Sequence, residues 1–129
     1  MKRVAGCIIR DEVGRLLLLH RNTPELRQWE TPGGKAEQGE TDQDAAVREA
    51  FEELGVKVAV ISRLGETSFA SDDMSWHYAW FEAVIVSGDT PQIGEPDKFD
   101  DIRYWDIQEL EGRNDLSPNV INLLESGVL

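Results

Sequence analysis

Three glutamates, Glu49, Glu52 and Glu53, are spaced so that one helix would carry them on a common face. At about 100° per residue they fall within roughly 100° of one another. Like charges at these spacings repel, and within the helix only Arg48 lies nearby to offset them. Carboxylate oxygens are the ligands that hard divalent cations prefer, so the cluster indicates a metal site. The alternative is an ordinary solvated helix face.

The segment before these acids, WETPGGKAEQGE at residues 29–40, is rich in glycine. Gly33 and Gly34 follow Pro32, a combination that is also typical of a plain turn. Because glycine has no Cβ, its backbone can approach a ligand closely. The segment is therefore either a simple connection or a loop that brings backbone atoms to the acidic cluster.

Helix signals surround the glutamates and predict a helix over residues 42–54. Thr41 can cap its start, Asp44 occupies the position of a capping-box acid, and Gly55 fits just beyond its end. An apolar stripe at helical spacing should pack on a sheet, with the acids nearly opposite. The stripe consists of Val47, Ala50, Phe51 and Leu54.

The remaining pattern predicts strands mixed with a second helix. Ser117 and Pro118 can begin a helix over about residues 118–126, which Gly127 would end. Apolar runs predict strands at residues 4–9, 15–20, 56–61, 64–69, 77–86 and 103–105. A tight turn at residues 11–14 should join the first two. This combination indicates an α/β or α+β layered domain.

Composition and charge narrow the class of protein. With 129 residues and no repeat or linker, the chain is expected to be one domain, residues 1–129. The net charge of −12 disfavours polymeric nucleic acid as a partner. No apolar run approaches a membrane span and no signal peptide is visible. The lone Cys7 fits a buried inert thiol, so we expect a cytoplasmic protein without membrane association.

The loop and the acidic helix together match a known motif. From Gly34 through Glu40 and Arg48 to Val56, the residues resemble the Nudix box, G-x5-E-x7-R-E-U-x-E-E-x-G-U. All seven fixed letters are present. Ala50 stands where a larger aliphatic residue is commoner, a departure that concerns packing and not chemistry. The chain is thus identified as similar to Nudix hydrolases of the MutT-like branch.

The resemblance implies a fold and a cofactor. Nudix proteins adopt an α/β/α sandwich with a mixed sheet, with the box forming a loop, a helix and a loop. Members of the family bind Mg²⁺, or in some cases Mn²⁺. By position in the motif, the metal ligands here would be Glu49, Glu52, Glu53 and the carbonyl of Gly33.

The same resemblance implies a mechanism in which water is the nucleophile and a glutamate takes its proton. Glu49 is the favoured base, oriented by Arg48. Glu95 is the alternative, because MutT-like relatives place an extra acidic ligand or base in a late loop. Its other interpretation is a solvated turn acid beside Pro96.

Substrate contacts are also expected by resemblance. Arg21 and Lys35 match basic residues that meet phosphates in MutT-like enzymes, and Lys98 is a further candidate. Trp29 and Tyr78 are candidates to stack on a base. The alternatives are exposed surface lysines and aromatic rings that pack in the core.

Marks beyond the box favour one substrate class. The chain lacks the proline typical of ADP-ribose hydrolases and the tyrosine of many dinucleoside-polyphosphate hydrolases. Resemblance therefore favours a nucleoside triphosphate or its deoxy form, cleaved to the monophosphate and pyrophosphate by attack at the β-phosphorus. Another nucleoside diphosphate derivative, such as a dinucleoside polyphosphate or a nucleotide sugar, stays open as substrate. So do a non-catalytic nucleotide-binding domain and either a monomer or a homodimer.

Overall fold

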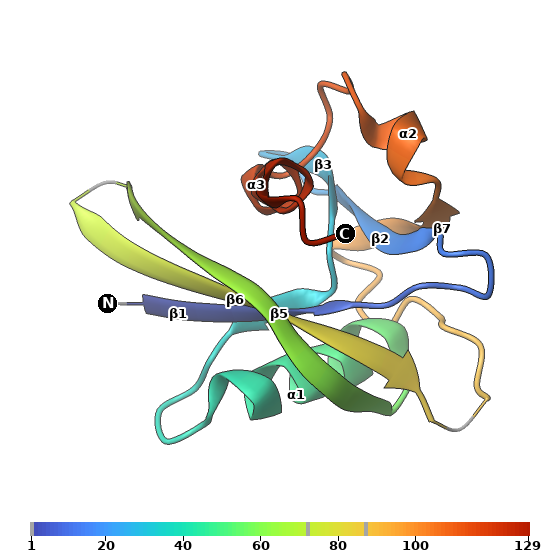
Figure 1. Cartoon of the computed structure of the whole chain (residues 1–129), viewed down its shortest axis with the longest axis horizontal. Helices are drawn as coiled ribbons and strands as arrows, with labels where there is room; N and C mark the ends of the chain where they lie inside the picture. Colours follow the sequence, from blue (N-terminus) through green and yellow to red (C-terminus); the bar gives the residue numbers. More distant parts are fainter. Residues whose placement is uncertain (1, 72, 87) are drawn as a thin grey trace.

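The computed structural model describes residues 2–71, 73–86 and 88–129, which form two β-sheets and three helices (Figure 1). The larger sheet has the order β4 (Gly33–Lys35), β1 (Lys2–Ile8), β6 (Met74–Ile85), β5 (Val58–Ser71). The smaller sheet has the order β3 (Arg27–Glu30), β2 (Leu16–Asn22), β7 (Phe99–Trp105). The helices are α1 (Asp42–Leu54), α2 (Ile107–Leu110) and α3 (Pro118–Ser126).

The layers follow from strands that are apolar on both faces. In Figure 1, α1 lies below the larger sheet, and the smaller sheet and α3 lie above it. In β2, Leu17 and Leu19 join the core that contains residues of α1, while Leu16 and Leu18 join the core that contains residues of α3. Within the larger sheet β1 and β6 run parallel and the other pairs antiparallel. The expected α/β/α sandwich with a mixed sheet is confirmed.

Both predicted helices form with the predicted ends. The Thr41 hydroxyl accepts a hydrogen bond from the Asp44 N–H at 3.0 Å, and Gly55 ends α1 with φ +69°. Because that φ is left-handed, glycine suits the position. In α3 the Ser117 hydroxyl accepts from the Val120 N–H at 3.3 Å. Capping chemistry therefore sets the limits of both helices.

The predicted apolar stripe of α1 is wrong at Phe51, whose residue surface is 54% exposed. The buried side of the helix instead contains Ala45, Ala46, Ala50 and Leu54 together with Glu53. Small residues let the helix approach the sheet closely, so the face that packs is the alanine face and not the phenylalanine face.

This orientation gives opposite expectations for two neighbouring substitutions. Leu54→Ala removes a fully buried side chain and should lower the free energy of unfolding by about 2–5 kcal/mol. Phe51→Ala should change it by less than about 1 kcal/mol, because the ring is exposed. Urea unfolding of both variants measures the difference. Equal losses would contradict the rotation of α1 described above.

The first two strands turn as predicted but do not form a regular hairpin. Asp11 and Gly14 make the tight turn, with Gly14 at φ +88° and its N–H donating to the Asp11 carbonyl at 3.0 Å. A single antiparallel bridge joins Arg10 and Leu16. Beyond it the strands diverge, because β1 pairs with β4 and β6 while β2 pairs with β3 and β7.

Some predicted strand limits were wrong for identifiable reasons. The runs at 56–61 and 64–69 belong to one strand, β5, which begins at Val58 and has polar Ser62 and Arg63 between its two bulges. Asp100 and Asp101 concealed the first half of β7. The short β3, β4 and α2 were not predicted. Gly33 and Gly34 have weak strand propensity, which favours a loop, but pairing with β1 places them in β4.

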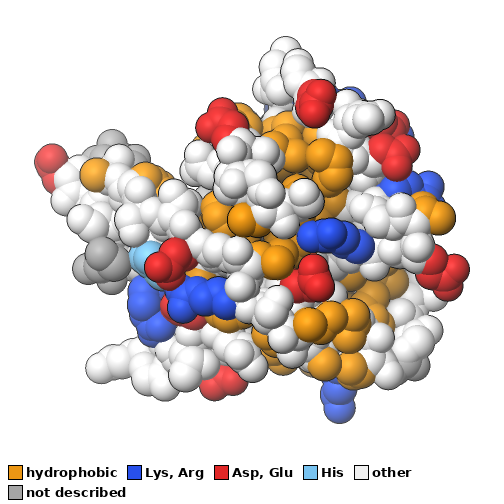
Figure 2. Space-filling model, viewed as in Figure 1, with side chains coloured by type: hydrophobic (Ala, Val, Ile, Leu, Met, Phe, Trp, Pro, Cys, Tyr) orange, Lys and Arg blue, Asp and Glu red, His pale blue; other side chains and the backbone are white. Residues whose placement is uncertain are grey.

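Figure 2 shows hydrophobic side chains exposed over the lower right of one face, where β5 and β6 lie side by side. Ile61, Val84 and Val86 are among the exposed hydrophobic residues of this region. The bulges in β5 interrupt the regular edge that a long outer strand would otherwise present.

Within the described ranges, no helix is both long enough and apolar enough to traverse a lipid bilayer.

Candidate functional site

The three glutamates of α1 differ sharply in exposure. Glu53 is 4% exposed, whereas the side chains of Glu49 and Glu52 are 15% and 44% exposed. The prediction that all three share the face opposite the packed side is therefore wrong for Glu53. Its carboxylate points inward beside the alanine face, and the cluster spans the border between core and surface.

The glycine segment lies directly against these acids. The Gly33 N–H donates to Glu53 Oε1 at 2.7 Å. A Cβ on Gly34 would lie 2.5 Å from the Glu49 carboxyl carbon, so a larger residue there would displace the side chain. Pairing of β4 with β1 fixes both glycines in place. Because Gly33 and Gly34 have no side chains, the carboxylates of Glu53 and Glu49 can lie directly against their backbone.

Arg48 ties the acids together. Its Nε donates to Glu40 at 2.8 Å, its Nη1 to Glu49 at 2.9 Å and to Glu52 at 3.2 Å. Its Nη2 donates to the Lys35 carbonyl at 3.0 Å. Hydrogen bonds from Arg48 lower the pKa of Glu40 to about 2 and so keep that carboxylate charged. The expected orienting role of Arg48 toward Glu49 has a direct contact to support it.

Electrostatics single out Glu53. Burial is the main cause that raises its pKa to about 9, opposed by the Gly33 hydrogen bond and reinforced by the nearby charges of Glu49, Glu95 and Glu30. Burial also raises the pKa of Glu49, and the Arg48 contacts partly offset it. A bound cation would stabilise both groups in their charged forms.

A pH dependence follows for the metal-free protein. The folded pKa of Glu53 lies above its ordinary 4.5, so the folded state holds a proton that the unfolded chain releases. Stability contributed by that proton is complete below about 4.5 and falls as pH rises toward about 9. Glu53→Gln should therefore become more stable relative to the parent as pH increases through this window.

Urea unfolding in EDTA at several pH values tests this, with Glu125→Gln, at an exposed position of α3, as the matched control. A constant difference between Glu53→Gln and the parent across the window would contradict the assigned burial of a protonated Glu53.

The oxygen donors of the cluster fit a divalent cation, although two of these carboxylates, Glu49 and Glu52, are paired with Arg48. Within the described part of the chain, no three His, Cys, Asp or Glu side chains are already gathered as a metal site. Glu49 and Glu52 face Arg48, while Glu53 is a buried carboxylate with a raised pKa. All-oxygen ligands with an uncompensated buried acid suit Mg²⁺ or Mn²⁺.

The late loop reaches the same place. The Gly94 N–H donates to the Glu53 carbonyl at 2.9 Å, and a Cβ on Gly94 would collide with the Glu52 carbonyl oxygen. Glu95 is consequently close enough to raise the pKa of both Glu49 and Glu53. Lys98 lies 3.5 Å from Glu95. The structure thus brings the predicted alternative base to the cluster.

A cavity of about 290 Å³ opens beside the two glycines. Of the predicted substrate contacts, Arg21, Lys35 and Tyr78 line it, but Trp29 and Lys98 do not. The other lining residues include Val4, Gln28, Glu30, Thr31, Gly33, Gly34, Phe69, Ser117, Pro118 and Asn119.

The two predicted stacking residues are buried, which corrects their assignment. Trp29 is 7% exposed and packs edge-on against Trp105, with ring centroids 5.0 Å apart. Tyr78 is 3% exposed and shares a 2.9 Å hydrogen bond with the Thr31 hydroxyl. Burial raises the Tyr78 pKa. Neither ring offers a free face to a base, and the alternative interpretation as core residues holds.

Three cavity residues escaped the sequence interpretation. Phe69 is 37% exposed and stacks on Trp76, with ring centroids 6.3 Å apart. Glu30 lies in the quoted WETPGGK segment but had no assigned role. Asn119 has a buried Oδ1 that accepts no hydrogen bond within the described residues. The sequence signal that could have identified Asn119 is its position in the first turn of α3, a helix whose start was predicted from Ser117 and Pro118.

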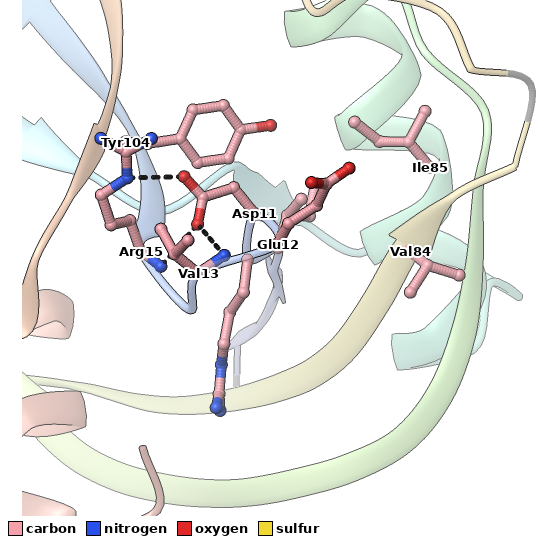
Figure 3. A pocket seen from close by; sticks show the side chains of 9 residues that line it. Asp11, Glu12, Val13, Arg15, Val84, Ile85 and Tyr104 are labelled. Atoms are coloured by element: carbon pink, nitrogen blue, oxygen red, sulfur yellow. Dashed lines mark hydrogen bonds and ion pairs between the residues drawn. The ribbon is translucent and has the colours of Figure 1, made fainter.

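A second cavity, of about 640 Å³, lies at the turn between β1 and β2 (Figure 3). Both of its arginines are already paired: Arg15 with Asp11 at 2.6 Å, and Arg10 with Glu82 at 3.5 Å. Val84 and Ile85 form its apolar side. It is not lined by the two glycines that lie against Glu49 and Glu53, so size does not identify the site here.

Comparison with known proteins agrees with this geometry. The family model described as the NUDIX domain matches residues 1–125. The uncharacterized Nudix hydrolase YvcI of Bacillus subtilis is 30% identical over 116 residues, covering 86% of this chain and 70% of that protein. The RNA pyrophosphohydrolase of Dinoroseobacter shibae is 38% identical over 66 residues, 51% of this chain and 41% of that protein.

A solved structure, the MutT NUDIX hydrolase of Burkholderia pseudomallei, superposes with a TM-score of 0.82 at 28% identity, covering 96% of this chain and 95% of that one. The chain spans only 37–41% of the length of several other curated relatives that it matches. The family match nevertheless extends over nearly every residue, from the first strand to the last helix. This chain belongs to the Nudix family.

Proposed function

We propose that this protein is a divalent-metal-dependent pyrophosphohydrolase that converts a nucleoside triphosphate, or its deoxy form, to the monophosphate and pyrophosphate. One observation carries the proposal. Glu49 and Glu53 meet the Gly33–Gly34 backbone at the edge of a cavity that Arg21 and Lys35 also line. Acids for a cation and bases for a phosphate chain thus lie side by side.

The cation would be held by Glu49, Glu52, Glu53 and the carbonyl of Gly33, with Mg²⁺ as the expected ion and Mn²⁺ as the alternative. When bound, it supplies charge neutralisation to the phosphates and lowers the pKa of water. Its binding would compete with the Arg48 contacts to Glu52, the more exposed of these acids, and would leave the Arg48 bond to Glu49 Oε1 in place.

The chain's own residues supply proton transfer and orientation. Glu49 takes the proton of the attacking water, and the 2.9 Å bond from Arg48 fixes where its carboxylate points. Because burial raises the pKa of Glu49, it is a stronger base than an exposed glutamate. Glu95 is the alternative base, with Lys98 partly neutralising it.

Binding of the substrate must overcome a net charge of −12. Arg21 and Lys35 offer local positive charge to the phosphates from the cavity wall. From the wall of the same cavity, the exposed Phe69 ring offers a face to the base. We further propose that the enzyme acts in the cytoplasm.

Two other functions are compatible with the same fold. Dinucleoside polyphosphates and nucleotide sugars carry the same diphosphate unit, so the proposed contacts to a cation and to phosphates would serve them as well. A non-catalytic nucleotide-binding domain would keep the fold, yet every acidic position of the box is intact here.

A panel of nucleotides incubated with Mg²⁺, with products separated by chromatography, distinguishes these functions. We expect nucleoside triphosphates to yield monophosphate and pyrophosphate, and EDTA to stop the reaction. Turnover confined to nucleotide sugars or dinucleoside polyphosphates would replace the proposed substrate. Tight binding without turnover of any panel member would establish the non-catalytic alternative.

A further inference from the structure

Arg21, the predicted phosphate contact, is already engaged by a carboxylate. In the antiparallel pairing of β2 with β3, Arg21 lies opposite Gln28 and diagonally from Glu30. Arg21 Nε donates to Glu30 Oε2 at 2.6 Å and Nη2 donates to Oε1 at 3.1 Å. The side chains are only 26% and 17% exposed, so this is a partly buried bidentate pair.

The pair leaves one edge of the guanidinium open. Nε and Nη2 are spent on Glu30, while Nη1 has no hydrogen-bond partner among the residues that the structure describes. Gln28 Nε2 donates to Glu30 Oε2 at 2.6 Å, and the Phe99 ring lies 5.0 Å from the Arg21 guanidinium carbon. These contacts fix both the plane and the rotation of the guanidinium.

The open edge belongs to the candidate site. Arg21, Gln28 and Glu30 all line the cavity that contains Gly33 and Lys35. Gly33, which lines the same cavity as Arg21, donates to Glu53, so the guanidinium and the carboxylate cluster border the same space. A phosphate bound at that cluster would meet the remaining N–H groups of Arg21.

A carboxylate in an anion-binding cavity needs a reason. Glu30 adds negative charge that acts on Glu53, and by itself this charge also repels a phosphate chain. This repulsion is offset if Glu30 orients the Arg21 guanidinium, because that group attracts the phosphates of the substrate. A guanidinium with one edge fixed by a carboxylate presents its other edge with little loss of side-chain freedom on binding.

We propose that Glu30 is a positioning residue: it holds Arg21 so that the free guanidinium edge faces the cavity and binds a phosphate oxygen of the substrate. The inference rests on the proposed function, because it takes a polyphosphate as the ligand. Gln28 supports the arrangement by holding Glu30. Glu30 itself touches no reacting atom.

The first test is a double-mutant cycle on steady-state kinetics with a nucleoside triphosphate and Mg²⁺. In Glu30→Gln the amide has a single acceptor oxygen, so it cannot hold both Nε and Nη2. We expect KM to rise about tenfold with kcat nearly unchanged, as for the loss of one charge-assisted hydrogen bond. In an Arg21→Ala background the same substitution should leave KM unchanged or lower it, because only repulsion by Glu30 remains.

The reversal separates positioning from a merely structural role. If Glu30→Gln raises KM by the same factor with and without Arg21, or lowers KM in the parent, the proposal is overturned. Asp115→Asn is the matched control, since Asp115 holds Arg113 through the same Nε and Nη2 edge at 2.9 and 2.7 Å but does not line the cavity. It should leave KM unchanged.

A second measurement keeps the inference independent of turnover. Calorimetric titration of inorganic pyrophosphate with Mg²⁺ into the parent and the same variants reports phosphate binding directly. We expect about tenfold weaker binding in Glu30→Gln and no further loss when Arg21 is absent. Absent turnover in the parent with this pattern intact would reject the proposed function alone, whereas unchanged pyrophosphate affinity in Glu30→Gln would reject the positioning role alone.

Discussion

Glu53→Gln is expected to reduce turnover by more than about 100-fold, beyond the 10- to 100-fold typical of residues that only support a metal ligand. The amide keeps the size of the side chain and can still accept the Gly33 hydrogen bond. It lacks the negative charge that a cation requires. Because Glu53 is 4% exposed and has a raised pKa, removing its charge should not destabilise the fold.

Initial rates at saturating Mg²⁺ and circular dichroism measure both parts of this expectation. Glu125→Gln, an exposed change on α3, should retain parental activity. If Glu53→Gln keeps activity within a few-fold of the parent, Glu53 is not part of the metal site. Loss of the folded spectrum would show that the charge is needed for structure instead.

Arg48→Gln is expected to lower kcat/KM by about 10- to 100-fold and to raise the Mg²⁺ concentration needed for half-maximal rate. Arg48 contacts Glu40, Glu49 and Glu52 at once, so its loss leaves three like charges without a common partner. Arg48→Lys should recover little of this activity. An ammonium cannot reproduce hydrogen bonds that leave one planar group in three directions.

A magnesium titration of the rate for Arg48→Gln and Arg48→Lys tests this account. Full activity in Arg48→Lys would mean that charge alone matters at this position and that the hydrogen-bond geometry does not orient Glu49. An unchanged magnesium requirement in Arg48→Gln would separate the arginine from the metal ligands altogether.

The local parts of the fold were predictable because their causes are local. Thr41 and Gly55 limit α1 through bonds to residues within one turn, and Ser117 does the same for α3. The spacing of Glu49, Glu52 and Glu53, all on one helix, likewise required no knowledge of the rest of the chain. Conformation set by neighbours in sequence can be read from sequence.

Features set by distant partners could not be predicted in this way. The burial of Glu53 depends on how closely the alanine face of α1 approaches the sheet, and a hydrophobic Phe51 suggested the wrong rotation. Trp29 is buried because of Trp105, far along the chain. The Arg21–Glu30 pair arises from a β2–β3 register that the sequence pattern did not reveal.

The most direct test of the proposed reaction is hydrolysis of a nucleoside triphosphate in ¹⁸O-labelled water with Mg²⁺. The products are separated, and mass spectrometry measures the ¹⁸O content of each. Because water is the nucleophile and no covalent enzyme intermediate is proposed, one label should enter per turnover. We expect monophosphate and pyrophosphate, with the label in pyrophosphate, since attack falls on the β-phosphorus. Label in the nucleoside monophosphate would move the attack to the α-phosphorus. Formation of nucleoside diphosphate and orthophosphate would contradict the proposed reaction itself.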